Sequence, residues 1–456
     1  MTSAPRALPA VGSVIERAAI RALDERWTTP MVTDAVRAII AAARTGSPLP
    51  SDDTAWVAAI DARLTEQTRP SLRAAINATG VVLHTNLGRA PLARAALAAI
   101  GEIAHGASTL EYDADRGVRG SRHTHCARLL CELTGAEDAI VVNNCAAGLV
   151  LALQALAAGR ETVVSRGELV EIGGSFRVPE IMTASGTTLV EVGTTNRTHA
   201  DDYRRALSPR TAAIVKVHRS NFVIEGFTAE ASVRDLRPIA SEAGVPLIHD
   251  FGSGLMLDLS AWGLTGERTV PETVREGATL IIMSGDKLMG GPQAGIVLGT
   301  REAIGALRRH PLARALRVDK LTLAALEATL ALYRDPVRAR REIPALAMLT
   351  ETPEVIRARV VAIADAITAA TGTAVAIEPC EATVGGGAFP TARIPSFAVT
   401  IAADAPSLEA GLRHGAIPVV GRIADGRLWL DLRSVLPEDD AVLVQMLLQA
   451  LQPGVR

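Results

Sequence analysis

The stretch LIIMSGDKLMGGP, residues 280–292, joins an apolar run to a glycine-rich loop that contains Lys287. The run Leu280–Met283 predicts a buried strand, so the loop would lie at the carboxyl edge of a sheet. A lysine in such a place can be desolvated enough for its amine to attack an aldehyde. Gly290 and Gly291 would let the backbone approach a ligand closely. The stretch therefore predicts Schiff-base chemistry at Lys287.

Lysine is rare in this chain. Of the 47 basic residues, 44 are arginine and only Lys216, Lys287 and Lys320 are lysine. Arginine stays protonated in proteins and is a poor nucleophile. Lys216 lies within an apolar, strand-like run, and Lys320 begins a helical stretch where a solvated face is expected. These positions leave Lys287 as the candidate nucleophile.

Short apolar runs alternate with helical patterns over residues 76–325. The helical patterns include residues 148–158 and 233–243. Such alternation predicts an α/β domain whose mostly parallel sheet is covered by helices on both faces. Ligands of such sheets bind beyond the carboxyl ends of the strands. The predicted strands are Ala139–Val142, Thr162–Ser165, Thr188–Val192, Ala212–Val217, Pro246–His249 and Leu280–Met283.

The two ends of the chain have different patterns. Apolar residues recur at helical spacing near the N-terminus, which predicts a helical module. Residues 1–75 contain nine arginines and eight acidic residues, so this module would be nearly neutral. Near the C-terminus, helices over 353–370 and 439–451 enclose several short strands, which predicts a smaller α+β domain. The expected parts are 1–75, 76–325 and 326–456.

Composition excludes several classes of protein. The chain is 48% hydrophobic, as folded proteins are, and its net charge of −2 provides no global basic field. The N-terminus lacks the pattern of a secretory signal, and the apolar stretches are too short to span a bilayer. Four cysteines lack metal-ligand spacing, so we expect free thiols, no bound metal and a cytoplasmic protein without a membrane segment. They are Cys126, Cys131, Cys145 and Cys380.

Two further elements fit a pyridine-aldehyde cofactor bound at Lys287. Asp250 ends an apolar run, and its carboxylate would pair with the protonated ring nitrogen. Residues 145–147 follow a predicted strand and open a helix, whose N–H groups would bind a phosphate. The Ser284 hydroxyl could reach the same phosphate. The predicted set for pyridoxal 5'-phosphate is Lys287, Asp250, Ser284, Cys145, Ala146, Ala147 and Gly291.

This ordered set resembles that of the fold-type-I pyridoxal-phosphate transferases. More closely, the chain resembles the family of bacterial selenocysteine synthases, the L-seryl-tRNA(Sec) selenium transferases. The similarity extends from near the start of the chain to its end, and the departures are Cys145, Arg219 and Phe222. The similar segments are Ile76–Leu92, Glu111–Asp113, Gly117–Arg122, Glu171–Arg177, Ser284–Gly295, Pro311–Lys320 and Pro418–Arg433.

The resemblance implies conversion of L-seryl-tRNA(Sec) to L-selenocysteinyl-tRNA(Sec) with selenophosphate, through an aminoacrylyl (dehydroalanyl) ester. Lys287, displaced by the seryl amine, would take the Cα proton. Arg89, Arg314 and Arg317 would bind the anionic selenium donor, because arginine is a fixed, fork-shaped cation. The N-terminal module would contact tRNA, and dimers would close into a homo-oligomer of ten chains.

Six other residues are weaker candidates. Arg119 and Arg122 could contact a phosphate, either of the cofactor or in a neighbouring chain. Arg422 and Arg433 lie where related enzymes could hold a free carboxylate. His218 and Glu168 are candidates for stacking on the cofactor ring.

Two alternatives remain at this point. A related pyridoxal-phosphate enzyme could act on a free small amino acid or sugar acid by elimination or aldol cleavage, but the N-terminal module favours the tRNA reading. A tRNA-binding homologue without catalysis is the second alternative. The presence of Lys287, Asp250 and Ser284 together argues against it.

Overall fold

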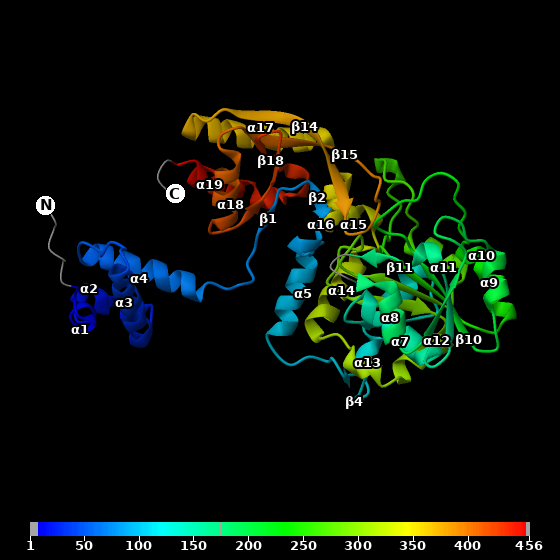
Figure 1. Cartoon of the computed structure of the whole chain (residues 1–456). Helices are drawn as coiled ribbons and strands as arrows, with labels where there is room; N and C mark the ends of the chain where they lie inside the picture. Colours follow the sequence, from blue (N-terminus) through cyan, green and yellow to red (C-terminus); the bar gives the residue numbers. More distant parts are fainter. Residues whose placement is uncertain (1–7, 173–175, 453–456) are drawn as a thin grey trace. The chain divides into compact units, whose positions relative to one another are not determined.

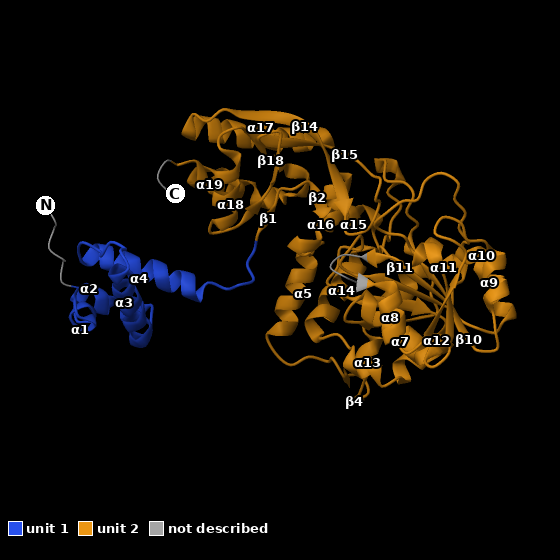
Figure 2. Cartoon of the chain, in the orientation of Figure 1, with its two compact units in different colours: residues 1–74 blue, residues 75–456 orange. Residues whose placement is uncertain are grey.

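The computed structural model describes residues 8–172 and 176–452, which fall into two compact units, Met1–Ala74 and Ala75–Arg456 (Figure 2). Residues 173–175 of the similar segment Glu171–Arg177 lie outside the described residues, as do the first seven residues of the predicted N-terminal module. Among the described helices, none combines the length and apolar character needed to cross a membrane.

The first unit is helical, as the apolar spacing predicted. Its buried face collects Val14, Val36, Ile60 and Leu64 into a core of its own. Asp52 caps the last helix by accepting a hydrogen bond from the Ala55 N–H at 2.8 Å. The helices are α1 (Val11–Ile15), α2 (Ala18–Arg21), α3 (Thr29–Arg44) and α4 (Asp53–Thr68), with a 3-10 turn at Ala22–Glu25.

A seven-stranded sheet forms the centre of the second unit (Figure 1). Its order is β5-β13-β12-β11-β10-β6-β9, and β13 alone among these strands runs antiparallel to its neighbours. The six predicted strands and the parallel arrangement are confirmed, whereas β13 was not predicted. The strands are β5 (Asp138–Val142), β6 (Glu161–Ser165), β9 (Thr188–Val192), β10 (Thr211–Val217), β11 (Leu247–Gly252), β12 (Leu280–Ser284) and β13 (Gly295–Gly299).

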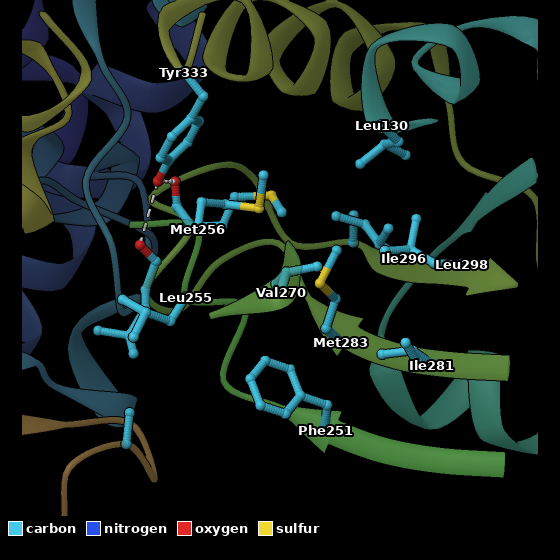
Figure 3. Close-up of a cluster of buried hydrophobic side chains, with 14 of the residues drawn as sticks. Leu130, Phe251, Leu255, Met256, Val270, Ile281, Met283, Ile296, Leu298 and Tyr333 are labelled. Carbon is cyan, nitrogen blue, oxygen red and sulfur yellow. Dashed lines mark hydrogen bonds between the residues drawn. The ribbon is translucent and has the colours of Figure 1, made fainter. Parts of the chain in front are cut away.

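Helices bury both faces of this sheet. One face packs against α6 (Ala127–Thr134), α10 (Val233–Glu242) and α14 (Lys320–Leu332), and Figure 3 shows part of that core. The other face packs against α7 (Cys145–Ala157), α8 (Val178–Ala184) and α12 (Arg301–Arg309). Gly148 lets α7 approach closely, because a Cβ atom there would lie 2.9 Å from Ile282 Cγ2.

The smaller sheet of the second unit combines a strand from the start of the unit with strands from its end. Its order is β17-β18-β15-β14-β2, and β2 pairs with β14 although about 300 residues separate them. Residues 76–83, which the sequence assigned with the large sheet, therefore pair with C-terminal strands instead. Strands β1 (Ile76–Asn77) and β16 (Val419–Val420) form a separate two-stranded parallel sheet. The other elements are β2 (Val81–Leu83), β14 (Val375–Gly385), β15 (Ile394–Ile401), β17 (Arg422–Ala424), β18 (Arg427–Asp431), α17 (Pro353–Thr371), α18 (Ala405–His414) and α19 (Asp440–Leu451).

Candidate active site

Lys287 lies in the loop that follows β12, and the residue is only 5% exposed. The loop closes on itself, since the Gly291 N–H donates to the Gly285 carbonyl at 2.8 Å. It is also held from outside: the Tyr333 hydroxyl donates to the Met289 carbonyl at 2.8 Å, one of the bonds dashed in Figure 3. Gly290 has φ of +70°, and a Cβ atom there would lie 2.1 Å from Ile343 Cγ2. These contacts hold the backbone of the loop that carries Lys287.

Asp250 lies near the carboxyl end of the neighbouring strand β11, two residues before its last residue. A Cβ atom built on Gly252, two residues further on, would lie 3.7 Å from Lys287 Nζ. Burial raises the pKa of the Asp250 carboxyl, although the nearby Lys287 ammonium and the Cys145 thiol act in the opposite direction. A buried carboxyl of this kind needs a cationic partner, and the protonated nitrogen of a pyridine ring would provide one.

The N-terminus of α7 lies on the same side of the sheet. Asn144 caps the helix by accepting the Ala147 N–H at 2.9 Å, so this N–H, which we predicted as a phosphate ligand, is already bonded. The N–H groups of Cys145 and Ala146 belong to the first helical turn, whose amides have no intrahelical acceptor. An anion is therefore favoured at Cys145 and Ala146.

Cys145 connects the helix to Asp250. Its thiol donates to Asp250 Oδ1 at 3.5 Å, and burial raises the thiol pKa well above its ordinary value. The thiol therefore stays protonated and acts as a donor. Ser284, 4% exposed, ends β12 within the same cluster, and its hydroxyl acts to lower the pKa of the Cys145 thiol against the larger effect of burial. The lysine, carboxylate and helix N-terminus thus fit the amine, ring nitrogen and phosphate contacts that pyridoxal phosphate requires.

A strongly basic cavity of about 450 Å³ adjoins β5, an edge strand of the seven-stranded sheet. Arg317 takes part in a β-bridge with Val142, the last residue of β5, so the cavity adjoins the strand that leads into α7. Glu111 is the carboxylate in its lining and pairs with Arg122 at 2.8 Å and Arg119 at 3.2 Å. The lining arginines are Arg119, Arg122, Arg308, Arg309, Arg314 and Arg317.

The structure does not place all three predicted donor-binding arginines together. Arg314 and Arg317 line the cavity, together with Arg119 and Arg122. Arg89 instead pairs with Asp286, the neighbour of Lys287, at 3.0 Å. Arg89 thus belongs to the lysine side of the site in this chain.

The two candidates for stacking on the ring have different environments. The His218 backbone N–H donates to the Asp250 carbonyl at 2.9 Å, and its side chain is 28% exposed at the edge of the site. Glu168 is buried and bonded to the Lys216 ammonium and to the Val217 N–H. Its carboxylate is committed to that ion pair, so the stacking role suggested for Glu168 is wrong. Lys216, which the sequence placed within a strand-like run, is buried in β10.

The two candidate arginines of the C-terminal region, Arg422 and Arg433, are also committed to other contacts. Arg422 lies over the Trp429 ring at 4.6 Å. Arg433 is 1% exposed, and its guanidinium donates to the backbone carbonyls of Met348, Glu351 and Pro395 at 2.8, 2.9 and 2.6 Å. These were the positions at which related enzymes could hold a free carboxylate. Arg433 instead holds backbone segments together.

Sequence reasoning missed Glu267. Its side chain is 3% exposed and accepts hydrogen bonds from His218 Nε2 and from the Phe389 N–H, both at 3.1 Å. Neither partner is near it in sequence, and the loop that carries it has no strong pattern. Only the folded structure identifies this contact.

Known proteins resemble this chain along its length. The family model described as "SelA: L-seryl-tRNA selenium transferase" matches residues 75–436. The L-seryl-tRNA(Sec) selenium transferase of Moorella thermoacetica is 47% identical, over 99% of this chain and 97% of that protein. The protein of the same name from Rhizobium meliloti (strain 1021) is 49% identical over 95% of each chain.

A solved structure shares the fold. That of a D-glucosaminate-6-phosphate ammonia-lyase covers 85% of this chain and 98% of its own, with a TM-score of 0.58 and 24% identity. The predicted fold-type-I class is thereby confirmed. The family match covers most of the chain, and the sequence identities extend over nearly all of it. The chain belongs to the SelA family of L-seryl-tRNA selenium transferases.

Proposed function

We propose that this chain is a pyridoxal-phosphate-dependent enzyme that converts L-seryl-tRNA(Sec) to L-selenocysteinyl-tRNA(Sec), with selenophosphate as the donor. The observation that carries the proposal is the juxtaposition of a buried lysine, Lys287, with the carboxylate of Asp250 in β11 and the N-terminus of α7. The names of the full-length relatives supply the substrate.

The cofactor would be held by groups already in place. Lys287 Nζ would bind its aldehyde carbon, Asp250 would hold the proton on its ring nitrogen, and the amides of Cys145 and Ala146 would bind its phosphate. When bound, pyridoxal phosphate withdraws electrons from the seryl Cα, which makes the Cα proton acidic and lets the β-hydroxyl leave. Lys287 Nζ would be the base that takes the Cα proton.

The basic cavity fits the selenium donor. Selenophosphate is a compact polyanion, so binding it close to the serine β-carbon needs fixed positive charge. Arg314 and Arg317 provide that charge in the cavity, and Arg119 and Arg122 add to it. Arg89 would act from the lysine side, where Asp286 orients its guanidinium.

The contacts of the Arg433 guanidinium support a substrate whose carboxyl is esterified. An enzyme for free amino acids needs a cation for the substrate carboxylate, whereas the carboxyl of seryl-tRNA is already an ester. Arg433, which is buried in the turn after β18, has its guanidinium engaged with three carbonyls. This disfavours the alternative in which the chain acts on a free amino acid or sugar acid.

The remaining partners follow from the same proposal. We place the main tRNA contact on the first unit and the reaction in the cytoplasm, where aminoacylated tRNA is made. We further propose that the chain works as a homo-oligomer built from dimers, up to a ring of ten.

The test of the proposal is incubation of the purified protein and pyridoxal phosphate with seryl-tRNA(Sec) and selenophosphate. Selenocysteinyl-tRNA should form, and free serine, the control, should not be converted. Borohydride reduction followed by peptide mass spectrometry should place the cofactor on Lys287. A product formed equally well from free serine would contradict the assignment.

A further inference from the structure

Glu267 is a buried carboxylate at the edge of the site, three residues before α11 (Val270–Glu276). One oxygen, Oε1, accepts from both His218 Nε2 and the Phe389 N–H, each at 3.1 Å. Burial alone would raise the pKa of this carboxyl. The hydrogen bonds from His218 and the Phe389 N–H, together with the charge of His218, outweigh burial, so the pKa is lowered. Glu267 therefore stays ionised and is a strong acceptor.

The fully buried Ser253 lies beside this contact, and its hydroxyl also helps to lower the pKa of the Glu267 carboxyl. The Ser253 carbonyl accepts the N–H of Leu288, the residue after Lys287, at 3.1 Å. The surroundings of Glu267 are thus continuous with the loop that carries the lysine.

His218 brings the contact into the site. Its backbone N–H donates to the Asp250 carbonyl at 2.9 Å, and its ring lies 6.1 Å from that of Phe251. Since Glu267 engages Nε2, this ring nitrogen is the donor, and Nδ1 remains for a ligand. The carboxylate therefore sets both the orientation of the imidazole and its hydrogen-bonding pattern.

Phe389 brings a second element to the same oxygen. It lies in the loop between β14 and β15 and is 3% exposed in the core shared with the large sheet. The loop is seated closely, because a Cβ atom on Gly387 would lie 2.9 Å from Ser220 Oγ. A single carboxylate oxygen thus joins the tip of the small-sheet hairpin to His218.

We propose that Glu267 is a positioning residue of the transferase reaction: it orients His218 in the active site and ties that orientation to the β14–β15 hairpin. The assignment of a reaction rests on the proposed function, whereas the coupling between Glu267, His218 and the hairpin does not. The residue acts through His218 and would not itself touch the substrate.

The test uses the full chain with Glu267→Ala, the isosteric Glu267→Gln, His218→Gln and the Glu267→Ala/His218→Gln double variant. Glu276→Gln is the matched control, because Glu276 is a buried carboxylate on the adjoining helix that pairs with Arg268 at 2.7 Å. The measurements are kcat and KM for seryl-tRNA, visible circular dichroism of bound cofactor, and tryptic cleavage after the exposed Arg393 in the hairpin loop.

We expect Glu267→Ala to lower kcat by roughly 10- to 100-fold, the loss typical for a buried charge-assisted hydrogen bond, with little change in KM. The cofactor should still be trapped on Lys287, but its circular dichroism should fall, and cleavage after Arg393 should accelerate. The double variant should be no slower in kcat than His218→Gln, because both changes break one interaction. Glu267→Gln should fall between Glu267→Ala and the unaltered chain.

Additive losses in the double variant would overturn the proposal, as would an equal loss in Glu276→Gln, which would indicate a general effect on folding. Unchanged cleavage after Arg393 in Glu267→Ala would overturn the link to the hairpin. Absence of trapped cofactor in the unaltered chain would instead refute the proposed function. Cleavage after Arg393, which needs no cofactor, would then still decide whether Glu267 holds the hairpin.

Discussion

Arg89 and Asp286 form an ion pair of 3.0 Å directly beside Lys287, and Arg89 itself has a left-handed backbone with φ of +63°. The Asp286 carbonyl also accepts the Ala90 N–H at 3.2 Å. Backbone and side chain of one aspartate thus hold the segment around Arg89 against the lysine loop. The pair explains how a segment far away in sequence supplies a cation at the site.

Asp286→Asn should therefore weaken binding of the selenium donor more than binding of the cofactor. Losing the charge frees Arg89 from its fixed position, and a partly exposed pair of this kind contributes about 1 kcal/mol, or roughly fivefold in KM for selenophosphate. Steady-state kinetics with varied selenophosphate measures the effect, and borohydride trapping on Lys287 should be unchanged. Arg94→Ala, on the surface of α5 (Arg94–Ala104), is the control. Loss of trapping with an unaltered KM would contradict this prediction.

Glu111 should make stability depend on pH. The Arg122 hydrogen bond and the charges of Arg122, Arg119 and Arg317 lower the pKa of Glu111 below its ordinary value of 4.5, although burial acts in the opposite direction. A carboxylate whose folded pKa is lowered stabilises the fold fully above its unfolded pKa, and this stabilisation disappears as pH falls through the folded pKa. Glu111→Gln should thus lower Tm at pH 7, and the difference from the unaltered chain should vanish in acid.

Thermal unfolding from pH 7 down to about pH 3 checks this prediction, since that range spans the ordinary glutamate pKa. Glu102→Gln, on the exposed side of α5, is the control and should show no such trend. A Tm difference that stays constant over the whole range would show that Glu111 acts through packing instead of charge.

The central sheet could be predicted because its strands are short apolar runs, and the positions of Lys287, Asp250 and Cys145 followed because parallel strands bring their carboxyl ends to one edge. β13 was missed because its apolar run, three residues between two glycines, is too short to distinguish from a loop. The pairing of residues 81–83 with β14 could not be predicted, since it joins segments 300 residues apart.

Side-chain partners were the harder part of the site. Glu168 and Arg433 looked like site residues because they are polar and follow predicted strands. In the structure, Glu168 is bound in a buried ion pair with Lys216, and Arg433 donates to backbone carbonyls. Glu267 shows the converse, because its role depends on contacts with segments 49 and 122 residues away. Periodicity places an element, but it does not determine which distant side chains meet.

Arg433 should act on stability and not on substrate binding. Arg433→Lys keeps the charge but cannot reach three carbonyls, so buried acceptors lose their donors, and the expected loss is about 3 kcal/mol of unfolding free energy. Urea denaturation measures it. Arg427→Lys, whose half-exposed partner Glu378 lies at 3.2 Å, should change stability by less than about 1 kcal/mol. A raised KM for seryl-tRNA at unchanged stability would restore the substrate-binding role.

Deletion of residues 1–70 should separate tRNA recognition from cofactor chemistry. The first unit has its own core of Val14, Val36, Ile60 and Leu64, and the described contacts of Lys287 and Asp250 all come from the second unit. The truncated chain should therefore fold, keep cofactor absorbance and lose binding of tRNA(Sec). Because the module is nearly neutral, it would recognise tRNA shape through a local surface, so affinities must be compared at one salt concentration. Unchanged tRNA affinity in the truncated chain would place the contact on the second unit instead.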